Sequence, residues 1–424
     1  MKTAFRLLIG IAIFAPSALA QPPAALVDRV QSSAPFKAAQ AFLDTDYERI
    51  VREVVQITEI EATPFKEQKR ARAYLDMLAQ HGLTNVAMDA EGNVMGIRKG
   101  AGQGPLIAIA AHLDTVFPEG ADVKVKRQGT RLSAPGVGDD SMALSTLLAI
   151  IRALDAAKIQ TRSDILFIGD VGEEGEGDLR GMKYLFLKGP YKDKITAFIT
   201  IDGTGPGNAI ANSGTGSKRY RVTFKGPGGH SYGAFGLVNP AYAMAKAIDK
   251  FSNMQVPRSP KTTFNAGVIG GGTSVNSIPF ESWMEVDMRS ESAAELSTEA
   301  ETFIGLMHQA VEEENKARST AQGKIELDIK LIGDRPSDTT PVESTLVQTA
   351  SAAIRAFGLQ PRYEASSTDA NIPISLNIPA IRMNGGGSGG RSHSPDEWMD
   401  VEKTALVKGV SIVMATLLAT AGMQ

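Results

Sequence analysis

Three short apolar runs in this chain each end in a carboxylate or an imidazole, and this pattern constrains the fold most strongly. The runs lie at 105–111, 164–169 and 195–201, and they are followed by His112, Asp170 and Asp202. Continuous apolar runs of this length are typical of strands buried on both faces of a sheet. Helical segments separate them, which predicts an α/β fold with a mixed sheet covered by helices. Polar residues after such strands gather at one edge of the sheet, where α/β proteins bind their ligands.

Composition and charge exclude several classes of protein. Of 424 residues, 43% are hydrophobic and 21% are charged, the profile of a globular chain long enough for two domains. The net charge of −3 and the lack of a basic stripe argue against nucleic acid as a partner. No cysteine occurs, so disulfides are excluded and a transition-metal site must use imidazole and carboxylate ligands.

The first 20 residues have the pattern of an export signal. Lys2 and Arg6 precede an apolar run, and Ala18-Leu19-Ala20 suits cleavage after Ala20. The run is too short to span a bilayer comfortably, and no later segment is expected to be transmembrane. We therefore expect an exported protein, periplasmic or secreted, without a stable membrane anchor after cleavage of the signal.

The order of the expected helices and strands changes in the middle of the chain. Residues 217–333 predict the order β-α-β-β-α-β, the ferredoxin-like split unit, after which the alternation of helices and strands resumes. The expected architecture is a helix-covered mixed-sheet domain, formed by residues 21–216 and 334–424. A ferredoxin-like α+β domain is inserted into it.

Two motifs place neighbouring carboxylates beside glycines. Asp139 and Asp140 come before a helix expected at 141–157, where an aspartate can cap the helix instead of binding a metal. Glu173 and Glu174 lie in a glycine-rich stretch that fits a solvated acidic loop or a weak calcium site equally well. Adjacent carboxylates repel unless a cation or a shared proton relieves them. Both pairs in one buried pocket would therefore require an ion.

Two histidines complete the candidate set. His112 is followed by Asp114, whose carboxylate could orient the imidazole and raise its basicity, although the histidine could also merely cap a strand end. His393 lies in the sequence Arg-Ser-His-Ser-Pro. Together with the acidic residues, these side chains suit a pair of zinc ions. A paired-metal site with a spare carboxylate predicts hydrolysis of an amide or peptide bond.

In this order and spacing, the motifs resemble the dizinc exopeptidase superfamily that includes peptidase T, glutamate carboxypeptidase, aminoacylase and succinyl-diaminopimelate desuccinylase. The resemblance covers nearly all of the chain after residue 20. It implies that His112 and Asp202 bind one zinc ion. It implies that Glu174 and His393 bind the other, with Asp139 as the bridge and a cis peptide bond after it. Cobalt and manganese are expected substitutes for zinc.

The resemblance also implies roles in catalysis. Glu173 would be the general base, taking a proton from a water that bridges the metals and passing it to the leaving amine. Asp114 would support His112. The metals would polarise the scissile carbonyl and stabilise the oxyanion.

The inserted domain would act as a lid and a dimerisation surface. His230, in Pro-Gly-Gly-His, would reach an active site, commonly that of the partner subunit, to assist the oxyanion. Asn276 and Arg289 match positions that bind the carboxylate or backbone of the substrate. Without the resemblance, His230 fits an ordinary loop residue and Arg289 fits an ion pair with Asp287 on the sheet surface.

The expected function is a zinc-dependent exopeptidase that hydrolyses short peptides and forms a homodimer. Two alternatives stay open: an N-acyl-amino-acid deacylase of the same superfamily, and a non-catalytic zinc- or peptide-binding protein of the same fold. A calcium-stabilised structural protein would not need His112 and His393. The sequence does not decide which end of a peptide is recognised.

Overall fold

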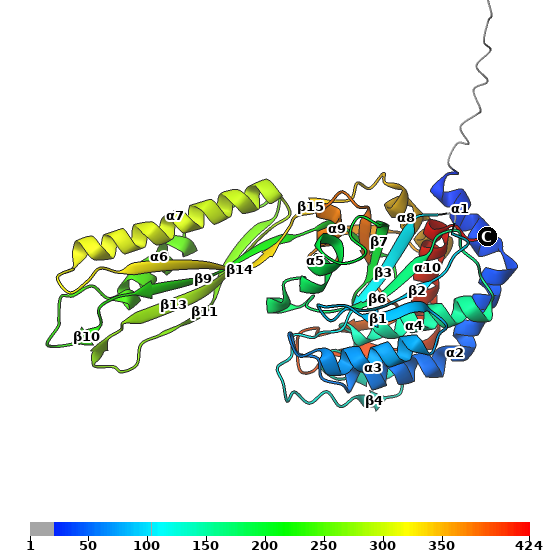
Figure 1. Ribbon diagram of the computed structural model, residues 1–424, viewed down its shortest axis with the longest axis horizontal. Helices are drawn as coiled ribbons and strands as arrows, with labels where there is room; N and C mark the ends of the chain where they lie inside the picture. The colour runs from blue at the N-terminus through cyan, green and yellow to red at the C-terminus, as the bar shows by residue number, and fades with distance from the viewer. Residues whose placement is uncertain (1–20, 103) are drawn as a thin grey trace, which may run out of the picture.

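The computed structural model describes residues 21–102 and 104–424, so the expected export signal at 1–20 lies outside the described residues. The described chain forms two units that lie side by side (Figure 1). The first, which we call the main domain, is built on a nine-stranded mixed sheet. The second, the inserted domain, is built on a four-stranded antiparallel sheet that interrupts the main domain in sequence. The expected fold class is confirmed.

The sheet of the main domain has the strand order β1-β2-β6-β3-β7-β17-β8-β15, with β16 paired to β8. Its strands are β1 (Thr84–Met88), β2 (Val94–Arg98), β3 (Leu106–His112), β6 (Ile165–Asp170), β7 (Ile195–Ile201), β8 (Ala209–Gly214), β15 (Asp338–Thr339), β16 (Arg362–Ser366) and β17 (Ala380–Met383). β3 is parallel to β6 and β7, and β7 is parallel to β17. The carboxyl ends of these four strands therefore share one edge of the sheet.

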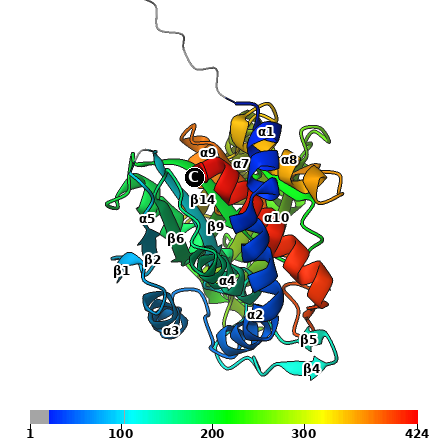
Figure 2. The same ribbon diagram turned by 90° about the vertical axis from the view of Figure 1, so that its right-hand side faces the viewer.

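Helices cover both faces of this sheet. One group consists of α1 (Pro23–Ser32), α2 (Ala34–Thr58), α3 (Gln68–Ala79), α4 (Ser141–Ala156), α8 (Thr345–Ala356) and α10 (Lys403–Ala421); the other consists of α5 (Arg180–Leu187) and α9 (Asn371–Ser375). Figure 2 shows α2, α4 and α10 packed together on the first face. Strand β3 contributes side chains to the cores on both faces of the sheet, because successive side chains of a strand point to opposite faces. Ile107 and Ile109 join the first core, whereas Ala108 and Ala110 join the second.

Helix α10 has the length and apolar composition of a membrane span, which the sequence analysis did not anticipate. Its mean hydropathy is 1.7, yet 72% of the apolar window is buried inside the fold. It packs against α1, α2, α4 and α8. Its apolar surface is therefore accounted for by the core of the main domain.

The inserted domain has the expected β-α-β-β-α-β order. Its elements are β9 (Gly216–Lys225), α6 (Pro240–Ser252), β11 (Thr262–Gly271), β13 (Glu281–Ser290), α7 (Ala293–Ala317) and β14 (Glu326–Arg335), and the sheet order is β11-β13-β9-β14. Strand β13 alternates between buried and partly exposed residues along its whole length. The buried side chains, such as Met284 and Met288, pack with Phe251 of α6 and Phe303 of α7 in a core separate from that of the main domain.

Several elements differ from the sequence expectations. Helix α2 begins at Ala34, not near 42, and α1 precedes it. Strands β8 and β16 were not predicted, because neither has a continuous apolar run. A further sheet joins β4 (Lys126–Gln128), β5 (Arg131–Ser133), β19 (Trp398–Asp400) and β18 (Ser388–Gly390). It brings the segment around His393 to the edge of the main sheet.

One buried carboxyl group makes the stability of the inserted domain depend on pH. Glu299 of α7 is 4% exposed, and its two carboxyl oxygens have no hydrogen-bond partner among the described residues. Burial, assisted by the charge of Asp287, raises the pKa of Glu299 from 4.5 to about 8. The folded state therefore holds this proton more tightly than the unfolded state. Its contribution to stability is full below pH 4.5 and falls as the pH rises through about 8.

We predict that Glu299→Gln raises the free energy of unfolding by about 1–3 kcal/mol at alkaline pH and changes it little near pH 5. Thermal unfolding across this pH range measures the effect. Glu301→Gln, at an exposed position of the same helix, is the matched control and should change nothing at either pH. An equal gain at both pH values would contradict the account.

Candidate metal centre

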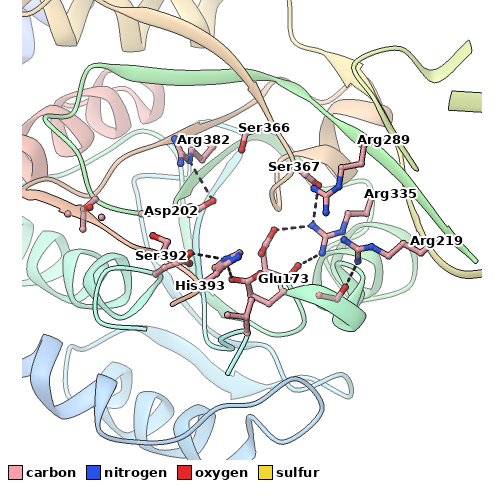
Figure 3. A pocket seen from close by; sticks show the side chains of 18 residues that line it. Glu173, Asp202, Arg219, Arg289, Arg335, Ser366, Ser367, Arg382, Ser392 and His393 are labelled. Carbon is pink, nitrogen blue, oxygen red and sulfur yellow. Dashed lines mark hydrogen bonds and ion pairs between the residues drawn. The ribbon is translucent and has the colours of Figure 1, made fainter. Parts of the chain in front are cut away.

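The five residues expected to bind metal come from separate segments and meet at one edge of the main sheet. His112 ends β3, and Asp202 directly follows β7. Asp139 lies before α4, Glu174 lies in the loop after β6, and His393 lies between β18 and β19. Four of them line a cavity of about 540 Å³ (Figure 3): Asp139, Glu174, Asp202 and His393.

Asp139 lies between the two histidines. Its Oδ1 is 3.0 Å from Nε2 of His112, and its Oδ2 is 3.3 Å from Nε2 of His393. Nε2 of His393 is also 2.9 Å from Oε1 of Glu174. One carboxylate that offers an oxygen to each of two imidazoles has the arrangement required of a bridging ligand. The Asp139–Asp140 peptide bond is cis, as the resemblance implied.

Two compact groups of donor atoms fit metal ions. His112, Asp139 and Glu174 form one group, and within it the donor atoms all lie within 4.8 Å of one another. The same limit holds for a second group of His112, Asp140 and Asp202. Imidazole and carboxylate donors at such spacing suit zinc and similar divalent metals. The two groups share His112, the second contains Asp140, which was not expected to bind metal, and His393 belongs to neither group.

The burial and hydrogen bonds of these groups exclude a solvated acidic loop and a helix cap formed by Asp140. His112 is 1% exposed, and Glu173 and Glu174 are 6% and 7% exposed, so the acidic pair is not a solvated loop. The side chain of Asp140 makes no capping hydrogen bond to α4. Instead its two oxygens accept from the backbone N–H groups of His112, at 3.3 Å, and Gly203, at 3.2 Å.

The crowding of buried carboxylates favours bound cations. Burial, followed by the charge of Glu174, raises the pKa of Glu173 to about 8, with Arg335 acting in the opposite direction. Burial also raises the pKa of Asp140 well above its usual range. Burial lowers the pKa of His112, but the nearby carboxylates, led by Asp140, outweigh burial, so the pKa lies well above its usual value. Divalent cations at this place would relieve the repulsion between the carboxylates.

Asp114 supports the centre in a way the sequence did not predict. Nδ1 of His112 lies 3.0 Å from the backbone carbonyl oxygen of Asp114, and 3.9 Å from its carboxylate. The carbonyl therefore orients the ring and leaves Nε2 toward Asp139. The carboxylate of Asp114 accepts the N–H groups of Gly172, Glu173 and Glu174 at 2.8, 3.1 and 2.8 Å. The carboxylate of Asp114 therefore lies within ion-pair distance of the imidazole and, in addition, holds the loop that carries Glu173.

Glu397 holds the segment of Asp139 in the same manner, and the sequence analysis missed it. This carboxylate is 1% exposed and accepts the N–H groups of Gly136, Gly138 and Asp139 at 3.0, 2.8 and 3.0 Å. Burial raises its pKa to about 7. The only hint in the sequence was an acidic residue four positions after His393.

The lining of the cavity is also rich in arginine. Arg219, Arg289, Arg335 and Arg382 line the cavity (Figure 3). Arg289 makes the ion pair with Asp287 that was the alternative interpretation, at 2.6 Å, and still faces the cavity. Only Arg289 was expected from the sequence; the other three lie in β9, at the end of β14 and in β17. Their positions near strand ends were the available signal.

His230 and Asn276 do not join this cavity within one chain. His230 lies in β10 (Gly229–His230), at the end of the inserted domain far from the main domain (Figure 1). Asn276 lies beside it, with its carbonyl oxygen accepting the N–H of Ser231 at 2.9 Å. Among the described residues that line the cavity, neither is present. Within one chain of this structure, neither residue lies at the metal centre.

Comparison with known proteins agrees with this geometry. The model of "Peptidase family M20/M25/M40" matches residues 108–419. The chain therefore belongs to this peptidase family, and the expected superfamily is confirmed. A succinyl-diaminopimelate desuccinylase of Leptothrix cholodnii is 27% identical over 228 residues, which cover 49% of this chain and 58% of that protein. Matches to curated relatives span 32 to 59% of those relatives' own length.

Solved structures share the whole fold. The aminopeptidase PepT of Bacillus cereus has 21% sequence identity and a TM-score of 0.69, over 88% of this chain and 99% of that one. A tripeptidase of Staphylococcus aureus has 19% identity and a TM-score of 0.71 over the same shares. An M20 peptidase of Bacillus subtilis, described as binding a dinuclear metal, has 17% identity and a TM-score of 0.65 over 89% and 99%. At these identities the likeness shows a common fold.

We predict that Glu397→Gln weakens zinc binding about 10- to 100-fold, because the amide cannot accept all three N–H groups and the turn of Asp139 loosens. Competition with a chromogenic chelator measures the affinity. Glu402→Gln is the matched control, since Glu402 also accepts backbone N–H groups, those of Thr404 and Ala405, but at the start of α10. Unchanged zinc affinity in the Glu397 variant would show that this carboxylate does not hold the centre.

Proposed function

We propose that this protein is a zinc-dependent exopeptidase that hydrolyses the amide bond of short peptides or N-acyl amino acids. The observation that carries the proposal is the position of Glu173. This buried carboxylate lines the same cavity as the metal-binding residues, yet it belongs to neither compact donor group. A carboxylate that is free of the metals and adjacent to them suits proton transfer at an amide bond.

Each residue of the centre has a distinct task. His112, Asp202, Glu174 and His393 would hold a pair of zinc ions, with Asp139 between them. Bound zinc supplies Lewis acidity toward the scissile carbonyl and lowers the pKa of water. Glu173 would accept a proton from the attacking water and deliver it to the leaving nitrogen.

The arginines of the cavity favour substrates with a free carboxylate. Oδ1 of Asp287 is 2.9 Å from Nε of Arg219, and Oδ2 is 2.6 Å from Nε of Arg289. Two guanidinium groups therefore share one carboxylate, which leaves one positive charge for a substrate anion. The side chain of Arg289 is 39% exposed and can present its planar fork to such a group. N-acyl amino acids and the carboxyl-terminal ends of dipeptides meet this requirement.

We predict that the zinc-loaded protein hydrolyses dipeptides, tripeptides or N-acyl amino acids with a free carboxylate faster than the same compounds capped as amides. Glu173→Gln should lower kcat by about 1000-fold while zinc stays bound, because Glu173 is not a ligand. His393→Ala should lose zinc as well as activity. Released amine reports the rate, and metal analysis reports the zinc content.

The outcomes separate the candidate functions. Preference for acylated amino acids over dipeptides would identify a deacylase with the same mechanism. Zinc binding without turnover of any member of this panel would favour the non-catalytic alternative. Wild-type activity in Glu173→Gln would contradict the proposed mechanism directly.

We infer further that the active form is a homodimer in which His230 of one subunit serves the cavity of the other. His230 is exposed and lies at the far end of the inserted domain. Tyr232 and Phe235, which follow it, are each 90% exposed, and Val275 is fully exposed. Large apolar side chains displayed together at one tip favour a protein–protein contact.

We predict that subunit mixing reveals this arrangement. Glu173→Gln and His230→Ala chains should each be nearly inactive alone. Mixed dimers place an intact Glu173 opposite an intact His230, so an equal mixture should recover about a quarter of the wild-type rate. The rate after unfolding and refolding the two chains together measures it. A fully active His230→Ala protein, or no recovery on mixing, would contradict the dimer.

A further inference from the structure

The loop that carries Glu173 and Glu174 is bonded to the root of the inserted domain. We call root the ends of β9 and β14 where they join the main domain. Arg219 of β9 donates to the carbonyl oxygen of Gly175. Both carboxylate oxygens of Asp178 accept the N–H of Asp334, at 3.0 and 3.1 Å. Besides the contacts of the Arg335 side chain, the loop thus makes two contacts with the root.

Arg335, the last residue of β14, reaches Glu173 itself. One nitrogen, Nη1, is 3.3 Å from Oε1 of Glu173 and donates to Oγ of Ser367 at 3.1 Å. The other, Nη2, donates to the backbone carbonyl oxygen of Glu173. Arg335 is 4% exposed, so this guanidinium has little freedom to move away (Figure 3). The guanidinium of Arg335 therefore contacts both the backbone and the side chain of Glu173.

We propose that Arg335 is a positioning residue that fixes the carboxylate of Glu173 for proton transfer and ties its place to the root of the inserted domain. This inference rests on the proposed function, in which Glu173 is the general base. A guanidinium that bonds Glu173 at two points restricts the rotation of its side chain. Because Arg335 ends a strand of the inserted domain, a change in the angle of that domain would carry the carboxylate with it.

The neighbouring arginines have different partners. Arg289 faces Asp287, and Arg382 lies 3.6 Å from Asp202 and 3.1 Å from Glu364. Arg335 is therefore the one cavity arginine, among the described residues, whose guanidinium contacts Glu173. If Arg335 instead bound substrate, its loss would raise KM. If it positions Glu173, its loss lowers kcat.

The test compares Arg335→Gln, Arg335→Lys and Lys218→Gln in the zinc-loaded full chain. Lys218 forms an ion pair with Asp334 at the same root, 2.9 Å long, and does not contact the Glu173 loop. We expect Arg335→Gln to lower kcat about 100-fold with KM changed less than about threefold. Arg335→Lys, which keeps the charge but not the two-point grip, should lower kcat about 10-fold. Lys218→Gln should leave both constants unchanged.

Zinc content and the thermal unfolding midpoint are measured for every variant: zinc content should not change if Arg335 acts only through Glu173, and the midpoint shows that each variant is folded at the assay temperature. A kcat for Arg335→Gln within about threefold of wild type, or a loss confined to KM, overturns the inference. If Arg335→Gln does not fold, Arg335→Lys decides alone, and a kcat within about twofold of wild type overturns it. Glu173→Gln is assayed in parallel: if it remains active, the proposed function fails first, independently of Arg335.

Discussion

Buried carboxylates that accept backbone N–H groups from neighbouring loops hold the metal-binding segments in one place. Asp114 accepts N–H groups of the loop after β6, and Glu397 accepts those of the turn before α4. Asp140 bonds both the end of β3 and the residue after Asp202. Unpaired N–H groups in these buried loops would destabilise the fold by about 1–3 kcal/mol each. The same carboxylates add negative charge around the ligands. The same buried carboxylates therefore both hold the loops in place and favour the binding of cations.

The location of the centre could be predicted from sequence because strand ends determine it. The apolar runs before His112 and Asp202 become parallel strands β3 and β7, and their carboxyl ends lie at one edge. Two overlapping groups of residues that could hold a metal ion form there. The roles of Glu397 and Arg335 could not be predicted, because each depends on contacts with segments more than 150 residues away. Local pattern carries no information on such pairings.

The same limit explains why the contact of Asp114 with the loop of Glu173 was not predicted. Its spacing from His112 suggested a direct bond between the side chains, whereas folding brings the loop of Glu173 closer to its carboxylate. Strands β8 and β16 escaped prediction for a related reason. They pair with each other in the sheet, and sheet pairing rather than hydrophobic pattern makes them strands.

The cavity combines two opposite surfaces, and the two domains supply them jointly. Carboxylates of the main domain can gather cations, whereas Arg219 and Arg289 of the inserted domain face them with spare positive charge. The proposed substrate, an amide flanked by a carboxylate, would fit both surfaces, since its carbonyl suits the cations and its anion suits the arginines. Arg335 links these surfaces through Glu173. In the proposed mechanism, the residues for proton transfer and those for substrate binding would therefore be connected where the two domains meet.

Anomalous diffraction at the zinc edge, from crystals of the zinc-loaded protein, tests the account most directly. The account requires a pair of peaks about 3.5–4 Å apart. One should lie against His112 and Asp202, the other against Glu174 and His393, and Asp139 should touch both. A single peak, or zinc bound away from Asp139, would contradict it.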